Sequence, residues 1–182
     1  MKNQLTKLHK QCLVDMPMLI DVMAETINQM HAILGDYYED YWSLLNNHFI
    51  PKSQAKYDVV PNNWVVECFE KMPLERSVYV GYTIELCEKK ARNPHTFVIE
   101  IAYNLDEKEH AIYFLIEDQS KEIDLSGLIS DLQSTDEYLY GIEPTRLYVE
   151  ISVDETLSDE KIHKCSELFK AKILYPIITT LK

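Results

Sequence analysis

The sequence predicts an α+β fold: N-terminal helices, then a mostly antiparallel sheet of about four strands in the order β-β-β-α-β-α, with helices packed on one face. Two observations predict it. Apolar residues recur every three to four positions before residue 50, as on an amphipathic helix, and every second position after residue 76, as on half-buried strands. The length of 182 residues suggests a single domain, which we divide into a helical segment (1–50), a connection with a short helix (51–76) and a sheet with covering helices (77–182).

An apolar stripe with helical spacing runs through the first segment. Its members are Met16, Ile20, Met23, Ile27, Met30, Leu34, Tyr37, Tyr41, Leu44 and His48. Asp15 suits an N-cap and Pro17 suits a first turn, so we expect the helix to begin there, after a shorter helix that ends before Pro17. Gly35 is a position where the helix can bend or break.

The stripe has two interpretations. Met23, Met30, Tyr37 and Tyr41 either pack in a globular core or line the interface of a helical dimer. The positions beside the stripe are mostly apolar or aromatic, whereas a coiled coil carries charged residues there. This wide apolar face favours the globular core, and the homodimer is kept as the alternative.

The connection predicts one short helix. Residues 49–63 contain two prolines and polar residues, which is typical of a loop. Asn62 or Asn63 can cap a helix that carries Val65, Phe69 and Met72 and ends at Pro73.

The last segment predicts four strands and two helices. The strands cover residues 77–87, 96–104, 110–118 and 145–153, which are rich in β-branched and aromatic residues. Asp124 can cap a helix that carries Leu125, Leu128, Ile129 and Leu132, and residues 134–144 read as a loop. Ser158 can cap a final helix whose inner face carries Ile162, Cys165, Phe169 and Ile173, with Pro176 ending or kinking it.

The negative charge is concentrated in one region. The net charge of −12 contrasts with −14 for residues 96–160 alone, where 17 acidic residues face 3 basic ones. Such a field repels nucleic acid and anionic membrane and attracts basic partners. The sequence has no run of eighteen apolar residues and no secretory signal pattern, so we expect a cytoplasmic protein without membrane association. In that compartment the four scattered cysteines are expected to be reduced core thiols.

The sequence lacks the common catalytic and nucleotide-binding motifs. Four dispersed glycines cannot form a phosphate-binding loop, and neither GxSxG nor HExxH occurs. We therefore assign no catalytic residue, metal ligand or cofactor and expect a protein that is not an enzyme. His95 and His110 flank two strands and are expected at the same end of the sheet, as exposed loop residues.

Three acids leave an enzyme open as an alternative. Glu85, Glu100 and Glu150 each alternate with apolar residues, so we expect them on the sheet face opposite the core. A solvated sheet face is one interpretation. Clustered carboxylates that bind a divalent cation, as in a metal-dependent hydrolase or nuclease, are the other.

The leading functional hypothesis is a non-catalytic acidic interaction protein. It would act as an inhibitor, an antitoxin-like partner or an immunity-type protein that docks its acidic surface on a basic protein, including one that itself binds nucleic acid. The residues expected to contact this partner are Asp106, Glu107, Glu109, Glu117, Asp118, Glu122, Asp124, Asp136 and Glu137. A dimeric secretion-type chaperone is an alternative, because its small size, acidity and order of elements fit in layout.

Overall fold

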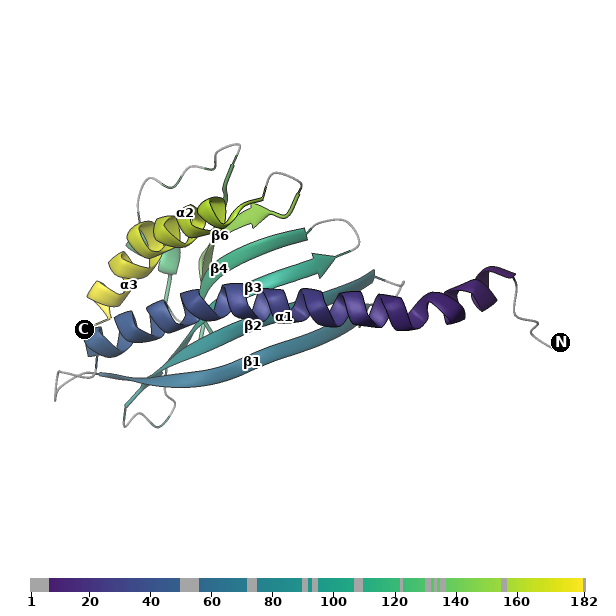
Figure 1. Ribbon diagram of the computed structural model, residues 1–182. Helices are drawn as coiled ribbons and strands as arrows, with labels where there is room; N and C mark the ends of the chain where they lie inside the picture. The colour runs from purple at the N-terminus through teal and green to yellow at the C-terminus, as the bar shows by residue number, and fades with distance from the viewer. Residues whose placement is uncertain are drawn as a thin grey trace.

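The computed structural model describes residues 7–49, 56–71, 75–89, 92, 95–106, 110–121, 123–129, 132, 134, 137–154 and 157–181. The elements in chain order are α1 (Lys7–Phe49), β1 (Tyr57–Lys71), β2 (Glu75–Glu88), β3 (Thr96–Asp106), β4 (His110–Asp118), the 3-10 helix η1 (Leu125–Leu128), β5 (Leu139–Glu143), β6 (Arg146–Ser152), α2 (Asp159–Phe169), the π-helical turn η2 (Lys170–Leu174) and α3 (Tyr175–Thr180). Figure 1 shows α1 running along the sheet, with α2 and α3 near its C-terminal end. The fold is α+β, as predicted.

The sheet has six strands in the order β1-β2-β3-β4-β6-β5, and all neighbours pair antiparallel. The four strands predicted from the period of two are β2, β3, β4 and β6. β4 spans the predicted residues 110–118, and the other three end within two residues of the predicted positions. The two strands that the prediction missed, β1 and β5, are the two edges of the sheet.

β1 occupies the segment that was predicted as a short helix over residues 62–72, so that prediction is wrong. Val65 and Phe69 have helical spacing, but the segment also holds β-branched and aromatic residues in close succession, which favour a strand. The asparagines expected to cap the helix instead lie at a β-bulge, because the register with β2 shifts between Asn62 and Val65. A bulge takes up an extra residue and bends the strand.

The segment between β4 and β6 also differs from the prediction. β5 lies within residues 134–144, which were predicted to be a loop. Its signal is weak because it has five residues and a central glycine, Gly141. Asp124 does cap a helix, since it accepts a hydrogen bond from the backbone N–H of Gly127 at 3.3 Å, but that helix is a single 3-10 turn.

α1 is one continuous helix of 43 residues, so the predicted break before Pro17 is wrong. An internal proline removes one backbone hydrogen bond and bends a helix, and the turns on both sides can still carry it. Gly35 does not interrupt the helix either. A Cβ atom at Gly35 would lie 3.3 Å from the hydroxyl oxygen of Tyr82, so the glycine lets α1 approach β2 closely.

The C-terminal helix begins as predicted and continues past Pro176. The hydroxyl of Ser158 accepts a hydrogen bond from the backbone N–H of Lys161 at 3.4 Å. The turn before the proline is π-helical, with the N–H of Tyr175 bonded to the carbonyl of Lys170. The wider turn accommodates a residue that lacks an N–H and whose ring clashes with the preceding turn of an α-helix.

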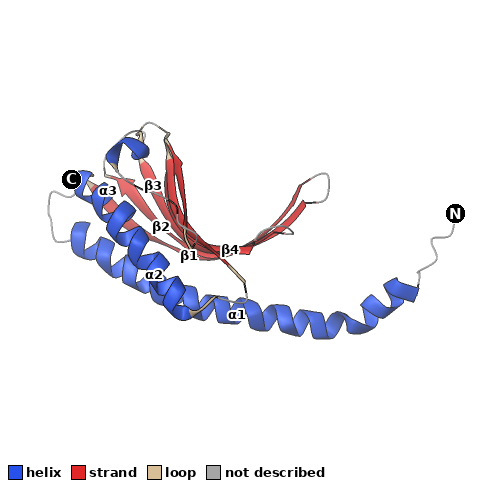
Figure 2. Cartoon of the chain, turned by 90° about the horizontal axis from the view of Figure 1, so that it is seen from above, coloured by secondary structure: helices blue, strands red, loops and turns tan. Residues whose placement is uncertain are grey.

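The helices pack on one face of the sheet, which forms the core (Figure 2). α1 contacts β1, β2 and β3, and α2 contacts β4 and β6. The rings of Tyr41 and Phe169 stack with centroids 5.8 Å apart, and both contact Phe114 on β4. The hydroxyl of Tyr41 lies 2.8 Å from that of Ser166, and both residues are fully buried. This hydrogen bond joins α1 to α2 inside the core.

Two cysteines lie among the residues whose side chains are described, and both are free thiols. Cys165 is buried in α2, and this burial raises the pKa of its thiol to about 12. It therefore remains protonated at neutral pH, as expected of a core thiol.

Candidate functional site

The sheet face opposite the helices is the candidate functional site, and we call it the second face. Side chains alternate between the two faces of a strand, so the residues between the core residues lie here. No helix among the described residues covers this face, and the sheet curves away from the helices (Figure 2). The strand register gives its members as Glu85, Val98, Glu100, Ala102, Asn104, Ala111, Tyr113, Leu115, Glu117, Leu139, Gly141, Glu143, Arg146, Tyr148 and Glu150.

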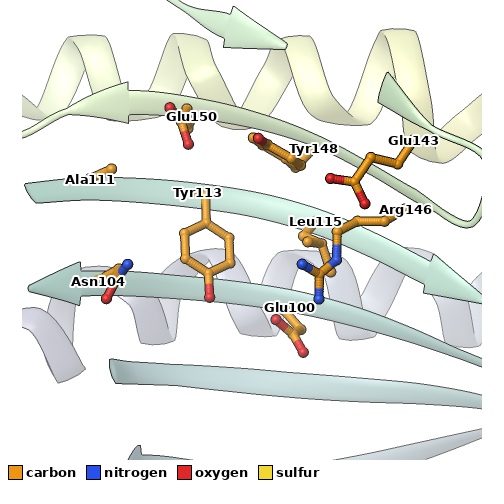
Figure 3. Close-up of a pocket in the computed structure, with 9 residues that line it drawn as sticks. All are labelled: Glu100, Asn104, Ala111, Tyr113, Leu115, Glu143, Arg146, Tyr148 and Glu150. Carbon is orange, nitrogen blue, oxygen red and sulfur yellow. The ribbon is translucent and has the colours of Figure 1, made fainter. Parts of the chain in front are cut away.

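A pocket of about 250 Å³ opens on the second face over β3, β4, β6 and β5 (Figure 3). Its walls combine carboxylates, two tyrosine rings, an amide and one guanidinium. The lining residues are Glu100, Asn104, Ala111, Tyr113, Leu115, Glu143, Arg146, Tyr148 and Glu150.

The only basic residue of the pocket lining, Arg146, lies between acids. It pairs directly with Glu117 on β4 and Glu143 on β5, and it donates a hydrogen bond to Glu117 Oε2 at 3.0 Å. Figure 3 shows its side chain reaching past Leu115 toward Glu100. Burial disfavours the charged guanidinium, but its hydrogen bond to Glu117 and the charges of Glu117, Glu100 and Glu143 outweigh burial and raise the pKa of Arg146. Arg146 therefore stays charged and holds part of this acidic cluster together.

Tyr148 lies flat against β5 because its partner there is a glycine. Gly141 pairs directly with Tyr148 in the register. A Cβ atom at Gly141 would overlap the Tyr148 ring, so any other residue would displace the ring. The glycine thus fixes one aromatic wall of the pocket.

Two of the residues that line the pocket, Ala111 and Leu115, are apolar. Leu115 and Ala102 are buried although they lie on the second face, so longer neighbouring side chains cover them. Figure 3 shows the ring of Tyr113 extending from β4 across β3, with its hydroxyl between Asn104 and Glu100. The second face therefore combines buried apolar residues with longer polar side chains that cover them.

The chemistry of this surface favours a cation. Glu100, Glu117, Glu143 and Glu150 bring four carboxylates to the pocket and its edge, against the one guanidinium of Arg146. Aromatic faces attract cations, and carboxylates accept the hydrogen bonds of ammonium and guanidinium groups. The pocket is therefore suited to a lysine or arginine side chain.

The three acids that suggested a metal site do share this face, as predicted, but on separate strands. Glu85 is diagonal to Glu100, which places them about 7–8 Å apart. Glu150 is two strands from Glu100, a lateral separation of about 10 Å. Among the described residues, no group of three or more His, Cys, Asp and Glu side chains is arranged to hold a metal ion.

The acidic residues predicted to contact a partner do not form one continuous patch. Asp106 ends β3 at the β3–β4 hairpin, whereas Glu117 and Asp124 lie at or beyond the other end of β4. A nine-residue strand separates these ends by about 27 Å. Asp124 and Glu137 are exposed. Four members of the set lie outside the described residues: Glu107, Glu109, Glu122 and Asp136.

Asp118, also predicted to contact a partner, is fully buried and organises the turn after β4. Its carboxylate accepts hydrogen bonds from the backbone N–H of Ser120 and of Ile123, both at 2.9 Å, and from the Ser120 hydroxyl at 2.5 Å. We therefore remove Asp118 from the proposed partner contacts. The Ser120 hydroxyl also lies 2.8 Å from Nδ1 of His95. His95 and His110 lie at opposite ends of the sheet, so the predicted common location is wrong.

The stripe residues divide along α1. Tyr41 is buried in the core, and Tyr37 is half-buried with its ring edge-on to Phe114 at 5.5 Å. Met30 is half-buried against the core. Met23 lies farther toward the N-terminus of α1, and its side chain is outside what the structure describes.

Sequence reasoning missed the residues that make the pocket more than an acidic surface. Tyr113, Arg146 and Tyr148 lie on strands that were predicted, but their common face was considered only for its acids. The signal was present in the period of two, which sets Arg146, Tyr148 and Glu150 on one side of β6. The period of two does not predict the strand order that brings these residues beside Glu100.

Comparisons with known proteins give no assignment. No protein-family model matches the chain, and neither a curated protein nor a solved structure matches it. None of the helices in the described part of the chain has the length and apolar character needed to cross a membrane.

Proposed function

We propose that the protein is a non-catalytic binding protein that holds a basic segment of a protein partner on its second face. Its role would be that of an inhibitor, an antitoxin-like partner or an immunity-type protein. The observation that carries the proposal is the pocket, whose described lining combines three carboxylates (Glu100, Glu143 and Glu150) and two tyrosine rings with one arginine, which pairs with a fourth carboxylate, Glu117, at the edge.

The pocket supplies both parts of cation recognition. A guanidinium or ammonium group can lie on the rings of Tyr113 and Tyr148 while it donates hydrogen bonds to carboxylates. Arg146 keeps Glu117 in place through their hydrogen bond, so the ordering of that carboxylate precedes binding. Leu115, which lines the pocket and is buried, keeps water from part of its wall, which strengthens these contacts.

The wider charge distribution supports a basic partner. Residues 96–160, which include β3 to β6, carry a net charge of −14. This field accelerates the approach of a basic protein and repels phosphate groups. Of the predicted contact residues, Glu117 lies on the second face, and Asp124 and Glu137 are exposed outside it. A protein that binds nucleic acid through lysine and arginine is a suitable partner, because its basic surface presents the groups that the pocket takes.

Calorimetric titration with an end-blocked hexa-arginine peptide tests the proposal. We expect binding that weakens about tenfold or more when sodium chloride is raised from about 50 mM to about 500 mM, because salt screens exposed charges. The double substitution Glu100→Gln with Glu150→Gln keeps the shapes of both side chains and removes their charges. We expect it to weaken the peptide by about tenfold at low salt.

The control separates the pocket from the overall charge. Glu39 is exposed on α1, away from the second face, so Glu39→Gln changes the net charge without changing the pocket. We expect the affinity of this variant to stay within about twofold of the original. The single variants Glu100→Gln and Glu150→Gln each remove one charge, as Glu39→Gln does. Equal losses of affinity in all three would show that the peptide responds only to net charge, and the proposal would fail.

A further inference from the structure

The N-terminal half of α1 takes no part in the proposed binding site. In Figures 1 and 2 this part of the helix extends past the sheet. Among the α1 side chains that the structure describes, none before Leu34 is buried, and the first that packs against the core is Met30. None of the side chains that the structure describes between Asp15 and Gln29 therefore packs against the core.

This projecting helix is apolar. Residues 12–23 have the sequence CLVDMPMLIDVM, in which only Asp15 and Asp21 are polar. Met18 is 64% exposed and Val22 is 55% exposed, the highest values among the large hydrophobic side chains described. A helix that is apolar on all sides is normally buried, and an isolated helix of this length is only marginally stable in water. The segment therefore requires a partner.

The continuity of α1 extends the apolar stripe. Because the helix begins at Lys7 instead of Pro17, Cys12 continues the series Met16, Ile20, Met23 and Ile27 at helical spacing. Spacings of three and four are those of a helix-to-helix seam. Met30, Leu34, Tyr37 and Tyr41 continue the same series onto the sheet, where Leu34 and Tyr41 are buried.

We infer that the projecting half of α1 pairs antiparallel with the same segment of a second copy of this chain. The charge distribution of the chain favours a second copy as the partner of this segment. Each chain carries −12 overall, whereas residues 7–29 carry two lysines and three acids, so two copies can meet along this segment with little of the repulsion that their overall charge would cause.

The order of charges gives the direction. Lys7 and Lys10 precede the apolar segment, and Asp21 and Glu25 lie at its end and beyond. Antiparallel pairing brings the basic end of each copy near the acidic end of the other, and it opposes the two helix dipoles favourably. A two-fold axis at the middle of residues 12–23 makes the interface self-complementary, as a closed dimer requires. Position 12 of one copy then lies opposite position 23 of the other.

Sedimentation equilibrium of the full chain tests the pairing. We expect the original protein to be a dimer at micromolar concentration. Ile20→Lys with Ile27→Lys, at two positions of the stripe, should raise the dimer dissociation constant by about tenfold or more, with an unchanged circular dichroism spectrum in the sheet region. Asn28→Lys with Gln29→Lys is the matched control, since both side chains are exposed polar residues on the same projecting helix. A monomeric original protein, or an Ile20/Ile27 variant that dimerises as well as the control, would overturn the inference.

Disulfide trapping tests the direction. In the variant Met23→Cys, mild oxidation should join position 23 of one chain to Cys12 of another, and mass spectrometry of the digest identifies the linked peptides. Links from 12 to 12 and from 23 to 23 would show a parallel pair and contradict the antiparallel arrangement. Neither result bears on binding of the hexa-arginine peptide, so this inference and the proposed function stand or fall separately.

Discussion

The two halves of α1 carry the same apolar repeat and meet different surroundings. In the C-terminal half, Leu34, Tyr41, Leu45 and Phe49 are buried against the sheet and α2. In the N-terminal half, Met18 and Val22 are the most exposed large hydrophobic side chains described. The periodicity of the stripe does not distinguish the halves, because it is set by helix geometry alone. What differs is whether another element lies opposite, and that depends on where the sheet ends.

The two halves of α1 also contribute to different free energies, that of folding and that of association. Burial in the C-terminal half stabilises the single chain, whereas the proposed dimer would bury the N-terminal half only on association. Substitutions in the first half should therefore change stability at every protein concentration. Substitutions in the second half should act only where self-association contributes.

The largest effect is expected for Leu45→Ala. Leu45 is fully buried, so its truncation loses transfer free energy and leaves a cavity. We expect the free energy of unfolding to fall by about 2–5 kcal/mol in urea denaturation. The matched variant is Met18→Ala at low protein concentration, where we expect a change within about 0.5 kcal/mol. Comparable losses in the two variants would mean that both halves are equally buried in the single chain.

A smaller effect is expected for Tyr41→Phe. The Tyr41 hydroxyl lies 2.8 Å from the Ser166 hydroxyl, and both side chains are fully buried. Removing one hydroxyl leaves the other without this partner, so we expect a loss of about 1–2 kcal/mol. The double variant Tyr41→Phe with Ser166→Ala removes both groups and should recover part of that loss. A double variant as unstable as the sum of the two single variants would show that the hydroxyls do not interact.

The central strands were predictable because their signal is local. β4 has the predicted bounds, and β2, β3 and β6 differ from prediction by at most two residues at either end. The two edge strands were not predictable, and the physical reason differs between them. β1 contains a bulge at Asn62, which breaks the period of two, and β5 is short with Gly141 at its centre. Pro17 misled, because neighbouring turns carry it within α1. Of the two outcomes predicted for Pro176, ending or kinking the helix, the continuation into α3 excludes the ending.

The candidate site was predictable only by face. Alternation placed Glu85, Glu100 and Glu150 opposite the core, and the register agrees. Their separations, the reach of Arg146 across β4 and the close contact of Tyr148 with Gly141 depend on strand order and register. These are long-range properties, and the local period of two along one strand does not predict them. For the same reason, the acidic residues predicted to contact a partner do not form one patch, because the nine-residue strand β4 separates them into two groups.

The smallest effect concerns the ion pair that joins the buried half of α1 to η2, and Asp40→Asn tests it. Lys170 Nζ lies 2.6 Å from Asp40 and also pairs with Glu167. Burial opposes the charged form of Lys170, but its hydrogen bonds to Asp40 and Glu167 raise its pKa, so the pair is present throughout the neutral range. Because Asp40 is half-exposed, solvent screening limits the expected loss to less than about 1 kcal/mol, and high salt should reduce it further. Asp36→Asn is the control, since Asp36 is exposed one turn earlier on the same helix. A loss from Asp40→Asn that persists unchanged in molar salt would mean that packing, and not charge, holds this end of α1 to the C-terminal helix.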